Sequence, residues 1–348
     1  MASFRRMTFL LMPLLLLICA PATQAKTLAE RSIFERLFQG PKVINVVEDF
    51  LTFWDAMKDK PLAQQRYWWK RMVEDKYRDY FERAVYRNSD VKTRRALLDE
   101  FLVRVPERIE ALREFNRHIN DPHISPLIGA FVAFKTRFPD YQQPRDIYIG
   151  LSLFRFDSAV RPVQNEAGVP DTLCLGADVL CGYSPDELQV ALLHEFFHLY
   201  HFGFLFQQPL LDEFRTPHMP LMIEGMAVAA TEAMLPGHPP AFYLHFSEDN
   251  HKAQEHDLRA NAGRFLELIA GNAPPEQYEA WFRNTPTDTV PSRGGYLLGY
   301  EVTRRVLAAL PLEQMVRLAP AQLREHAEEQ LAEIAGRQIL VLATAEQR

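Results

Sequence analysis

The segment LLHEFFHLYH (192 to 201) places two imidazoles and a carboxylate inside an apolar run. His194 and His198 are four residues apart, so on an α-helix both side chains leave the same face one turn apart. At this spacing two ring nitrogens can bind one ion at about 2.0 to 2.1 Å. Glu195 is too close in sequence to be a ligand with them, but it can reach a water molecule at the ion. The pattern is H-E-x-x-H, in which the histidines bind zinc and the glutamate is the general base.

The residues before this motif predict where its helix begins. Ser184 can act as the N-cap, Pro185 suits the first helical position, and Glu187 completes a capping box. Gly203 is expected to end the helix. So short a motif also arises by chance in roughly a few per cent of chains of this length, and two hydrogen-bonded core histidines are the alternative. A capped helix directly after a predicted strand favours the metal site.

A catalytic zinc site needs a third protein ligand and one open position. Glu224 is the only acid in the first half of an apolar helix expected to begin near Pro220. A buried carboxylate is costly unless a cation neutralises it, so Glu224 is the predicted third ligand. The alternative is a carboxylate that favours the helix dipole or points to water. His201 lies about 10 Å along the helix from His194 and cannot join the same ion. Three further groups in the intervening stretch have no setting that favours them: Asp212, Glu213 and His218.

Three motifs occur in the order HEFFH, EGMA and RGGYLLGY. This order resembles the gluzincin metallopeptidases, and more narrowly a bacterial group of predicted zinc-dependent proteases of unknown substrate. The resemblance covers roughly residues 145 to 310. It implies a zincin-like catalytic domain in which His194, His198 and Glu224 hold one Zn²⁺ ion per chain.

The chain departs from the gluzincin pattern at one position. Many gluzincins carry an aspartate four residues after the ligand glutamate, where it steadies a zinc-bound histidine, but this chain has Val228 there. Because hydrogen-bond partners of metal ligands hold those ligands in place, we expect Thr231, Glu232 or a backbone carbonyl to take over this role.

Tyr296 and Tyr300, in GYLLGY, lie one helical turn apart, so both can face the same way. A phenol near zinc could donate a hydrogen bond to the oxyanion of a tetrahedral intermediate, an interaction worth about 3 kcal/mol in the transition state. Tyr296 is favoured over Tyr300 because it lies at the helix start, nearest the loop rich in proline and glycine. Ordinary packing of both rings is the alternative.

The resemblance also implies a mechanism and a place for the substrate. Zinc would polarise the scissile carbonyl and lower the pKa of its water toward about 7, while Glu195 would pass a proton from that water to the leaving amine. In gluzincins the substrate commonly lies as an extra strand along the sheet edge just before the catalytic helix. We expect residues 172 to 180 to form that edge and to bind a peptide or protein substrate.

The spacing of apolar residues predicts an α+β fold that is mainly helical. The pattern is helical from Leu28 to about Arg137 and again after Ser184. Residues 145 to 156 and 171 to 180 are rich in aliphatic and β-branched residues and are expected to form two strands joined by a loop. We therefore expect a small sheet packed on the HExxH helix, preceded by a helical region.

The amino terminus has the features of an export signal. A basic start is followed by an apolar run from Thr8 to Ala20 and by small residues that end at Ala25. A transmembrane helix is the alternative, but the run is shorter than the usual ~20 residues, and we expect no stable membrane span after cleavage. A lipoprotein anchor at Cys19 is a poorer fit, because a bulky residue precedes it. These features predict a periplasmic or secreted bacterial protein.

Three parts are therefore expected: a signal peptide over 1 to 25, a helical region over 26 to 144, and a zincin-like metallopeptidase domain over 145 to 348. Signal cleavage removes two arginines and no acid, so the net charge changes from -6 to -8. A mildly acidic chain without a basic stripe is not expected to bind nucleic acid. An apolar fraction of 47% supports a sizeable core.

Cys174 and Cys181 are the two cysteines that remain after signal cleavage. On one extended strand they would lie about 23 Å apart, whereas bridged Cα atoms lie within about 7 Å of each other. A disulfide would need the chain to double back between them, for example at Gly176. Two buried thiols are the simpler expectation.

Together these patterns predict an exported zinc metallopeptidase. The alternatives are a zincin-fold scaffold or binding protein of the cell envelope without turnover, and a zinc hydrolase that acts on another bond. The presence of Glu195 argues against the scaffold, because loss of that base is the usual mark of an inactive copy.

Overall fold

The computed structural model describes residues 41 to 164, 168 to 207 and 213 to 337. These residues form a mainly helical fold with one small sheet, so the predicted α+β class is confirmed. The predicted signal peptide and Cys19 lie outside the described residues. Within the described ranges, no helix combines the length and the apolar character needed to cross a membrane.

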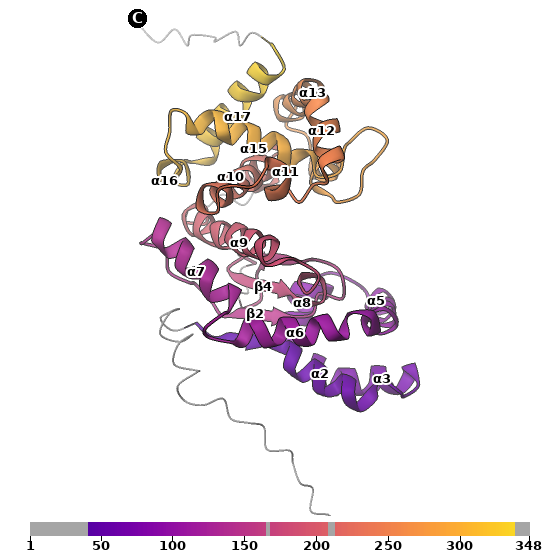
Figure 1. The fold of residues 1–348 in the computed structure, drawn as a ribbon. Coiled ribbons are helices and arrows are strands. Elements are labelled where there is room, and N and C mark those ends of the chain that lie inside the picture. The colour runs from indigo at the N-terminus through magenta and orange to yellow at the C-terminus, as the bar shows by residue number, and fades with distance from the viewer. Residues whose placement is uncertain (1–40, 165–167, 208–212, 338–348) are drawn as a thin grey trace, which may run out of the picture.

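One four-stranded sheet lies at the centre of the fold (Figure 1). Its strands, in the order in which they pair, are β1 (Val43–Asn45), β2 (Ile147–Gly150), β4 (Thr172–Gly176) and β3 (Ser158–Arg161). The first three run parallel, and β3 runs antiparallel to β4. Every residue of β2 and β4 is buried, so helices must cover both faces of the sheet.

The strand predicted over residues 145 to 156 is shorter in the structure. It ends at Gly150, because Leu153 and Phe154 adopt positive φ angles of 54° and 58° and turn the chain. Asp178 holds this turn by accepting hydrogen bonds from the backbone N–H groups of Ser152 (2.7 Å) and Phe154 (2.5 Å). Burial raises the pKa of Asp178 to about 6. The turn leads into β3, a strand that falls in the predicted connecting loop and was not foreseen.

The predictions for residues 171 to 180 are wrong in two respects. The strand β4 ends at Gly176, and the helical turn α8 (Ala177–Leu180) follows. A Cβ at Gly176 would lie 2.2 Å from the backbone oxygen of Phe156, so only glycine fits this close turn. The second error concerns which strand lies at the edge of the sheet. Residues 172 to 180 were expected there, but β4 lies between β2 and β3, so β3 is the edge strand. The chain does turn between Cys174 and Cys181, yet both thiols are free.

From residue 41 to 144, the described part of the amino-terminal region is helical as predicted except for β1. Its helices α2 and α6 lie under the face of the sheet that is turned away from α9 (Figure 1). The strand β1 pairs with β2, so the sheet spans the boundary expected at residue 145. The helical segments of this region are α2 (Val46–Met57), α3 (Leu62–Trp69), π-helical η1 (Lys70–Glu74), α4 (Arg78–Tyr80), π-helical η2 (Phe81–Tyr86), α5 (Val91–Arg104), 3₁₀-helical η3 (Val105–Arg108), α6 (Ile109–Asn120) and α7 (Pro126–Arg137).

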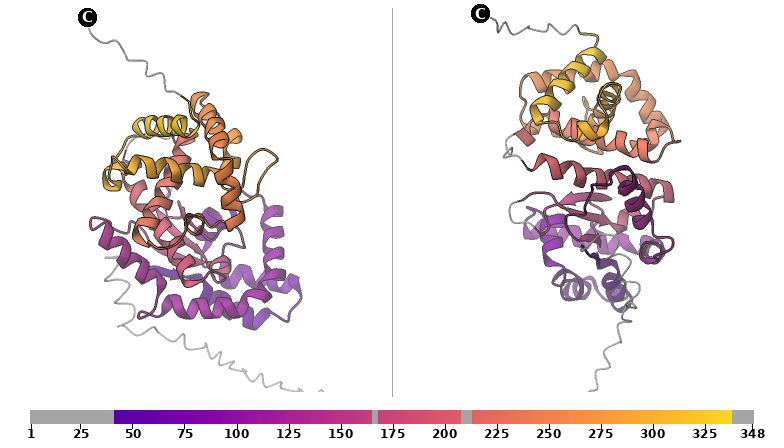
Figure 2. Two further views of the ribbon diagram at one scale, coloured as in Figure 1. Left: turned by 45° about the horizontal axis from the view of Figure 1, so that its top comes forward. Right: turned by 90° about the vertical axis from the view of Figure 1, so that its left-hand side faces the viewer.

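Helix α9 (Pro185–Leu205) covers the other face of the sheet, and the remaining helices lie beyond it (Figures 1 and 2). Helix α9 contacts β3 and β4 on one side and α10 on the other. The later helical segments are η4 (Glu213–Arg215), α10 (His218–Met234), α11 (Pro240–Tyr243), α12 (Glu248–His256), α13 (Leu258–Ala270), α14 (Pro275–Tyr278), η5 (Glu279–Phe282), α15 (Gly294–Leu307), α16 (Leu312–Met315) and α17 (Pro320–Ile334). The fold thus places α9 between the sheet and a second helical layer.

Candidate metal centre

Helix α9 carries the HExxH motif and begins as predicted. The hydroxyl of Ser184 accepts a hydrogen bond from the backbone N–H of Glu187 (3.3 Å), and the Glu187 carboxylate accepts one from the backbone N–H of Ser184 (2.7 Å). This capping box fixes the start of the helix. The predicted end at Gly203 is wrong by two residues, since the helix continues to Leu205. His194 and His198 therefore lie in the middle of a regular helix.

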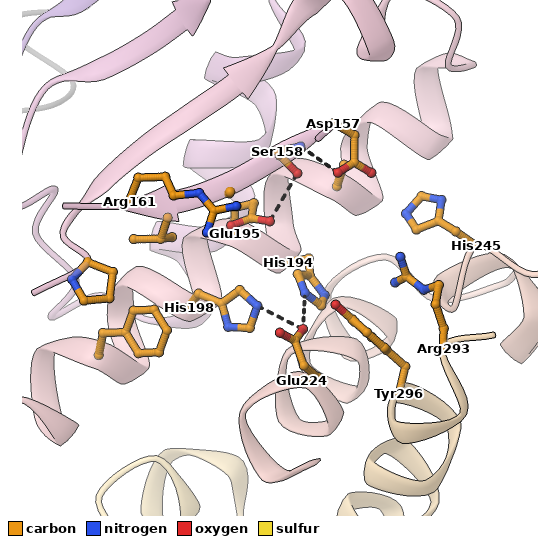
Figure 3. A pocket seen from close by; sticks show the side chains of 15 residues that line it. Asp157, Ser158, Arg161, His194, Glu195, His198, Glu224, His245, Arg293 and Tyr296 are labelled. Atoms are coloured by element: carbon orange, nitrogen blue, oxygen red, sulfur yellow. Dashed lines mark hydrogen bonds and ion pairs between the residues drawn. The ribbon is translucent and has the colours of Figure 1, made fainter. Parts of the chain in front are cut away.

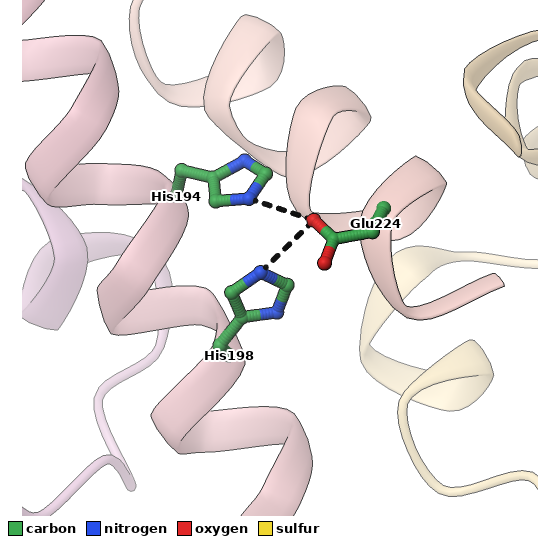
Figure 4. Close-up of side chains that lie close together, drawn as sticks. All are labelled: His194, His198 and Glu224. Carbon is green, nitrogen blue, oxygen red and sulfur yellow. Dashed lines mark hydrogen bonds and ion pairs between the residues drawn. The ribbon is translucent and has the colours of Figure 1, made fainter. Parts of the chain in front are cut away.

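His194, His198 and Glu224 come together from two helices (Figure 4). Glu224 Oε2 lies 3.1 Å from His194 Nε2 and 3.3 Å from His198 Nε2. One ligand atom from each residue lies within 4.8 Å of the others, so these three side chains could hold a metal ion. Ligand atoms on a tetrahedral zinc site, with bonds of about 2.0 to 2.1 Å, are about 3.3 Å apart. The two separations from the carboxylate oxygen to the imidazole nitrogens match that geometry.

The protonation of these three groups is coupled. Burial opposes the charge on Glu224, but His198 and His194 outweigh it and hold the pKa of this carboxyl below its usual range. Burial and the neighbouring His198 lower the pKa of His194 to about 4. Burial also lowers the pKa of His198, but the charge of the Glu224 carboxylate and its hydrogen bond together outweigh burial. The pKa of His198 is therefore raised. The site therefore favours an ionised carboxylate and a neutral His194, which are the forms that bind metal, and a protonated His198, which would have to lose its proton to bind one.

A close helix crossing places Glu224 in the site. Gly225 of α10 lies against Gly299 of α15, and a Cβ added at Gly225 would lie 2.1 Å from the backbone carbon of Gly299. A Cβ at Gly299 would lie 2.1 Å from the backbone oxygen of Leu221. The two helices thus meet backbone to backbone. The glycines in EGMA and GYLLGY are needed for this contact, which sets Glu224 and Tyr296 near each other.

Glu195 lies beside the metal-binding group but does not belong to it. Its side chain is buried, with 6% of the residue exposed. The hydroxyl of Ser158 donates to Glu195 Oε1 (3.2 Å), and Glu195 Oε2 has no hydrogen-bond partner among the described residues. Burial raises the pKa of Glu195 to about 7. A carboxylate with one free oxygen and a pKa near neutrality suits a general base.

These residues line a cavity of about 430 Å³ between the sheet edge and the second helical layer (Figure 3). The strand β3 forms one wall, and Glu224 and Tyr296 form the opposite wall. The sequence prediction missed five polar residues that line the cavity: Asp157, Ser158, Arg161, His245 and Arg293. Asp157, Ser158 and Arg161 lie on or just before an unforeseen strand, and His245 lies in a connection between helices, where no motif marks them. Arg293 is the first residue of the motif RGGYLLGY, but it was given no role. In the structure, His245 and Arg293 share one unusual backbone feature. Both have a positive φ of 52°, which residues other than glycine rarely adopt.

The two tyrosines of GYLLGY have different surroundings. Tyr296 lines the cavity, and its ring lies 6.4 Å from that of His194 at an interplanar angle of 25°. The guanidinium of Arg293 stacks on the other side, 3.9 Å from the centre of the Tyr296 ring. Tyr300 is fully buried and donates its hydroxyl hydrogen bond to Glu232 (2.8 Å). The two side chains therefore do not face the same way, and only Tyr296 reaches the site.

The partners expected for the metal ligands are different in the structure. Thr231 donates to the backbone oxygen of Ala227 (2.8 Å) in its own helix, and Glu232 accepts from Tyr300, so neither orients a histidine. His198 Nδ1 is buried without a partner among the described residues. Two other residues considered earlier, His201 and His218, are buried and lie outside the metal-binding group, as does the exposed Glu213. Asp212 lies outside the described residues.

Comparisons with family models, with curated proteins and with solved structures found no match. The resemblance to gluzincins therefore depends on the three motifs in the sequence.

Proposed function

We propose that this chain is an exported zinc-dependent peptidase of the gluzincin type, with a zincin-like catalytic domain. The observation that carries the proposal is the convergence of His194, His198 and Glu224 next to Glu195. The export part of the proposal depends on the sequence of residues 1 to 25. The substrate would be a peptide or a protein.

The donor set of the site supports zinc. Two imidazole nitrogens and one carboxylate oxygen form a common ligand set for catalytic zinc, and they leave one coordination position open. The carboxylate and both imidazoles lie in a buried place, where Glu224 would be costly without a cation. Bound zinc would supply Lewis acidity, which polarises a carbonyl oxygen and makes a water molecule easier to deprotonate.

The side chains around the cavity supply the remaining chemistry. Glu195 Oε2 is placed to accept a proton from a water molecule and to hand it to the leaving amine, and a pKa near 7 suits both transfers. Burial, followed by the charge of Glu224, raises the pKa of Tyr296, so its phenol keeps its proton and can donate a hydrogen bond to the oxygen of the reacting carbonyl. The edge of β3 offers main-chain groups to an extended substrate.

A single substitution tests the proposal. We expect Glu195→Gln to keep a stoichiometric amount of zinc, measured by elemental analysis of unchelated protein, and to lower kcat/KM for peptide hydrolysis by at least about 100-fold. Glu325→Gln, at an exposed position of α17, is the matched control and should change neither quantity. A scaffold protein would behave identically in wild type and variant. Absence of a stoichiometric transition metal from the wild type would overturn the proposal.

A further inference from the structure

Arg161 places a cation at one end of the cavity. It is the last residue of β3, and its side chain lines the cavity together with Glu195 and Phe202. Figure 3 shows Arg161 on one side of His194, with Arg293 and His245 on the opposite side. The proposed mechanism uses none of these three side chains for proton transfer.

The guanidinium of Arg161 has no anionic partner in the part of the chain that the structure describes. Its Nε is buried and makes no hydrogen bond there, and no carboxylate of the described residues forms an ion pair with it. Its nearest aromatic contact is loose, with the ring of Phe156 centred 5.5 Å away. Burial, followed by the charge of Arg87, lowers its pKa. Arg161 is partly exposed, and the charge of Glu195 across the cavity acts to raise its pKa, but no ion pair among the described residues compensates the guanidinium. A charge withdrawn from water without an ion pair is costly, so this position favours an incoming negative charge.

Arg293, at the opposite end, is different. Its guanidinium lies flat on Tyr296 at 3.9 Å and donates from Nη1 to Asn284 (3.4 Å). Through these contacts Arg293 holds the Tyr296 ring in place. Arg293 Nε is also buried without a hydrogen-bond partner among the described residues, but Arg161 is the one of the two arginines lining the cavity that makes no side-chain hydrogen bond to them at all.

The position of Arg161 in the sheet sets what that ligand can be. The strand β3 pairs with β4 on one side only, so a peptide can pair with its other side. An extended peptide held there would run past His194, His198 and Glu224. One of its side chains, or its carboxyl terminus, would then lie beside Arg161. The planar guanidinium binds a carboxylate through two parallel hydrogen bonds, which gives a geometry that neutral side chains do not match.

We propose that Arg161 selects substrates that carry a carboxylate close to the scissile bond, either an acidic side chain or the carboxyl terminus of the peptide. This inference rests on the proposed peptidase function and adds the substrate class to it. Arg161 acts in binding, and the proton transfers remain with Glu195.

The test begins with a digest of a defined peptide mixture by the zinc-loaded wild type, in which mass spectrometry locates the cleaved bonds. Matched synthetic peptides then carry Glu or Gln at each position within three residues of the bond, with an amidated carboxyl terminus. A second pair compares the free acid with the amide of one neutral peptide. The first set detects an acidic side chain and the second detects a terminal carboxylate.

We expect the wild type to cleave one carboxylate-bearing member of these pairs with kcat/KM at least about 10-fold above its neutral counterpart. Arg161→Gln should reduce that preference to less than about 2-fold by slowing cleavage of the charged peptide alone. Arg161→Lys should keep part of the preference, because it keeps the charge and loses the planar pair of donors. Arg155→Gln, an exposed arginine just before β3, is the control and should behave as the wild type does.

A binding measurement separates this inference from the proposed function. The same synthetic peptides, now carrying a fluorescent label, are titrated with Glu195→Gln and with the double variant Glu195→Gln, Arg161→Gln. Their affinities can be measured without turnover. Cleavage by the wild type without a preference for either carboxylate would overturn the inference and leave the peptidase standing. A wild type that cleaves no peptide, yet binds the charged peptide through Arg161, would overturn the peptidase and support the carboxylate site. Equal binding of charged and neutral peptides would overturn the inference in either case.

Discussion

At the scale of single residues, the surroundings of a side chain decide its role more than its place in a motif. Tyr296 and Tyr300 are identical residues one helical turn apart, yet one lines the cavity and the other donates to Glu232 inside the core. Arg293 stacks on Tyr296 and fixes its ring near His194. The structure thus separates a candidate hydrogen-bond donor for the reaction from a tyrosine that stabilises the fold.

The paired substitutions Tyr296→Phe and Tyr300→Phe exploit this difference. We expect Tyr296→Phe to lower kcat by about 100-fold with little effect on stability, because it removes one donor to the developing oxyanion. Tyr300→Phe should leave kcat within about 2-fold and lower the free energy of unfolding by about 1 kcal/mol, because Glu232 loses a partly buried hydrogen bond. Steady-state kinetics and denaturant unfolding measure the two effects. If both variants lose activity equally, Tyr296 has no special role.

The sequence was sufficient to predict which three residues come together as a group that could hold a metal ion, because each has a local signal. Helical spacing pairs His194 with His198, and an acid in an apolar helix marks Glu224. Arg161 and His245 have no such signal, since they reach the cavity only through the pairing of β3 and the path of a connection. Contacts between segments far apart in the chain are set by tertiary packing, which the local pattern does not encode.

At the scale of elements, the crossing of α10 and α15 positions the third ligand. The two helices touch at Gly225 and Gly299, so their separation is the smallest that backbones allow. Glu224 is adjacent to that contact in sequence. Because the imidazoles lie on α9, a displacement of α10 at this crossing would change the distance from the Glu224 carboxylate to both of them.

Gly299→Ala tests this dependence. The added Cβ would lie 2.1 Å from the backbone oxygen of Leu221, so the helices must move apart. We expect zinc affinity, measured by competition with a chelating dye, to fall by at least about 10-fold, and stability to fall by about 1 to 3 kcal/mol. Gly203→Ala is the control, because a Cβ there meets nothing within 4 Å and alanine favours the helix. Unchanged affinity in Gly299→Ala would show that the crossing does not position Glu224.

The elements of the sheet were harder to predict than the helices. The run from residue 171 to 180 has strand composition throughout, but Gly176 and the hydrogen bonds to Asp178 end β4 and begin α8. The strand β3 has only four residues, and sequence patterns this short do not distinguish a strand from a loop. Tertiary hydrogen bonds, which are not visible in the sequence, decide both outcomes.

At the scale of the whole molecule, the metal-binding helix depends on the amino-terminal region. The aromatic rings of Phe131 and Phe134 on α7 each lie 5.8 Å from the ring of Phe196 on α9. The strand β1 pairs with β2, and α2 contacts β2 from the face opposite α9. One hydrophobic core runs through these contacts from the first described helix to the last. The region expected to precede a separate catalytic domain is thus part of the same packed structure.

A fragment that begins at residue 145 tests whether the catalytic region folds alone. It would lose β1, α2, α6 and α7, and so expose one face of the buried strands β2 and β4 and the aromatic side of α9. We expect this fragment to show no cooperative thermal transition by circular dichroism and no stoichiometric zinc binding. A fragment from residue 41, which keeps every described element, should retain both properties. A shorter fragment that melts cooperatively and binds zinc would instead establish an independent domain at residue 145, with the amino-terminal helices as an addition to it.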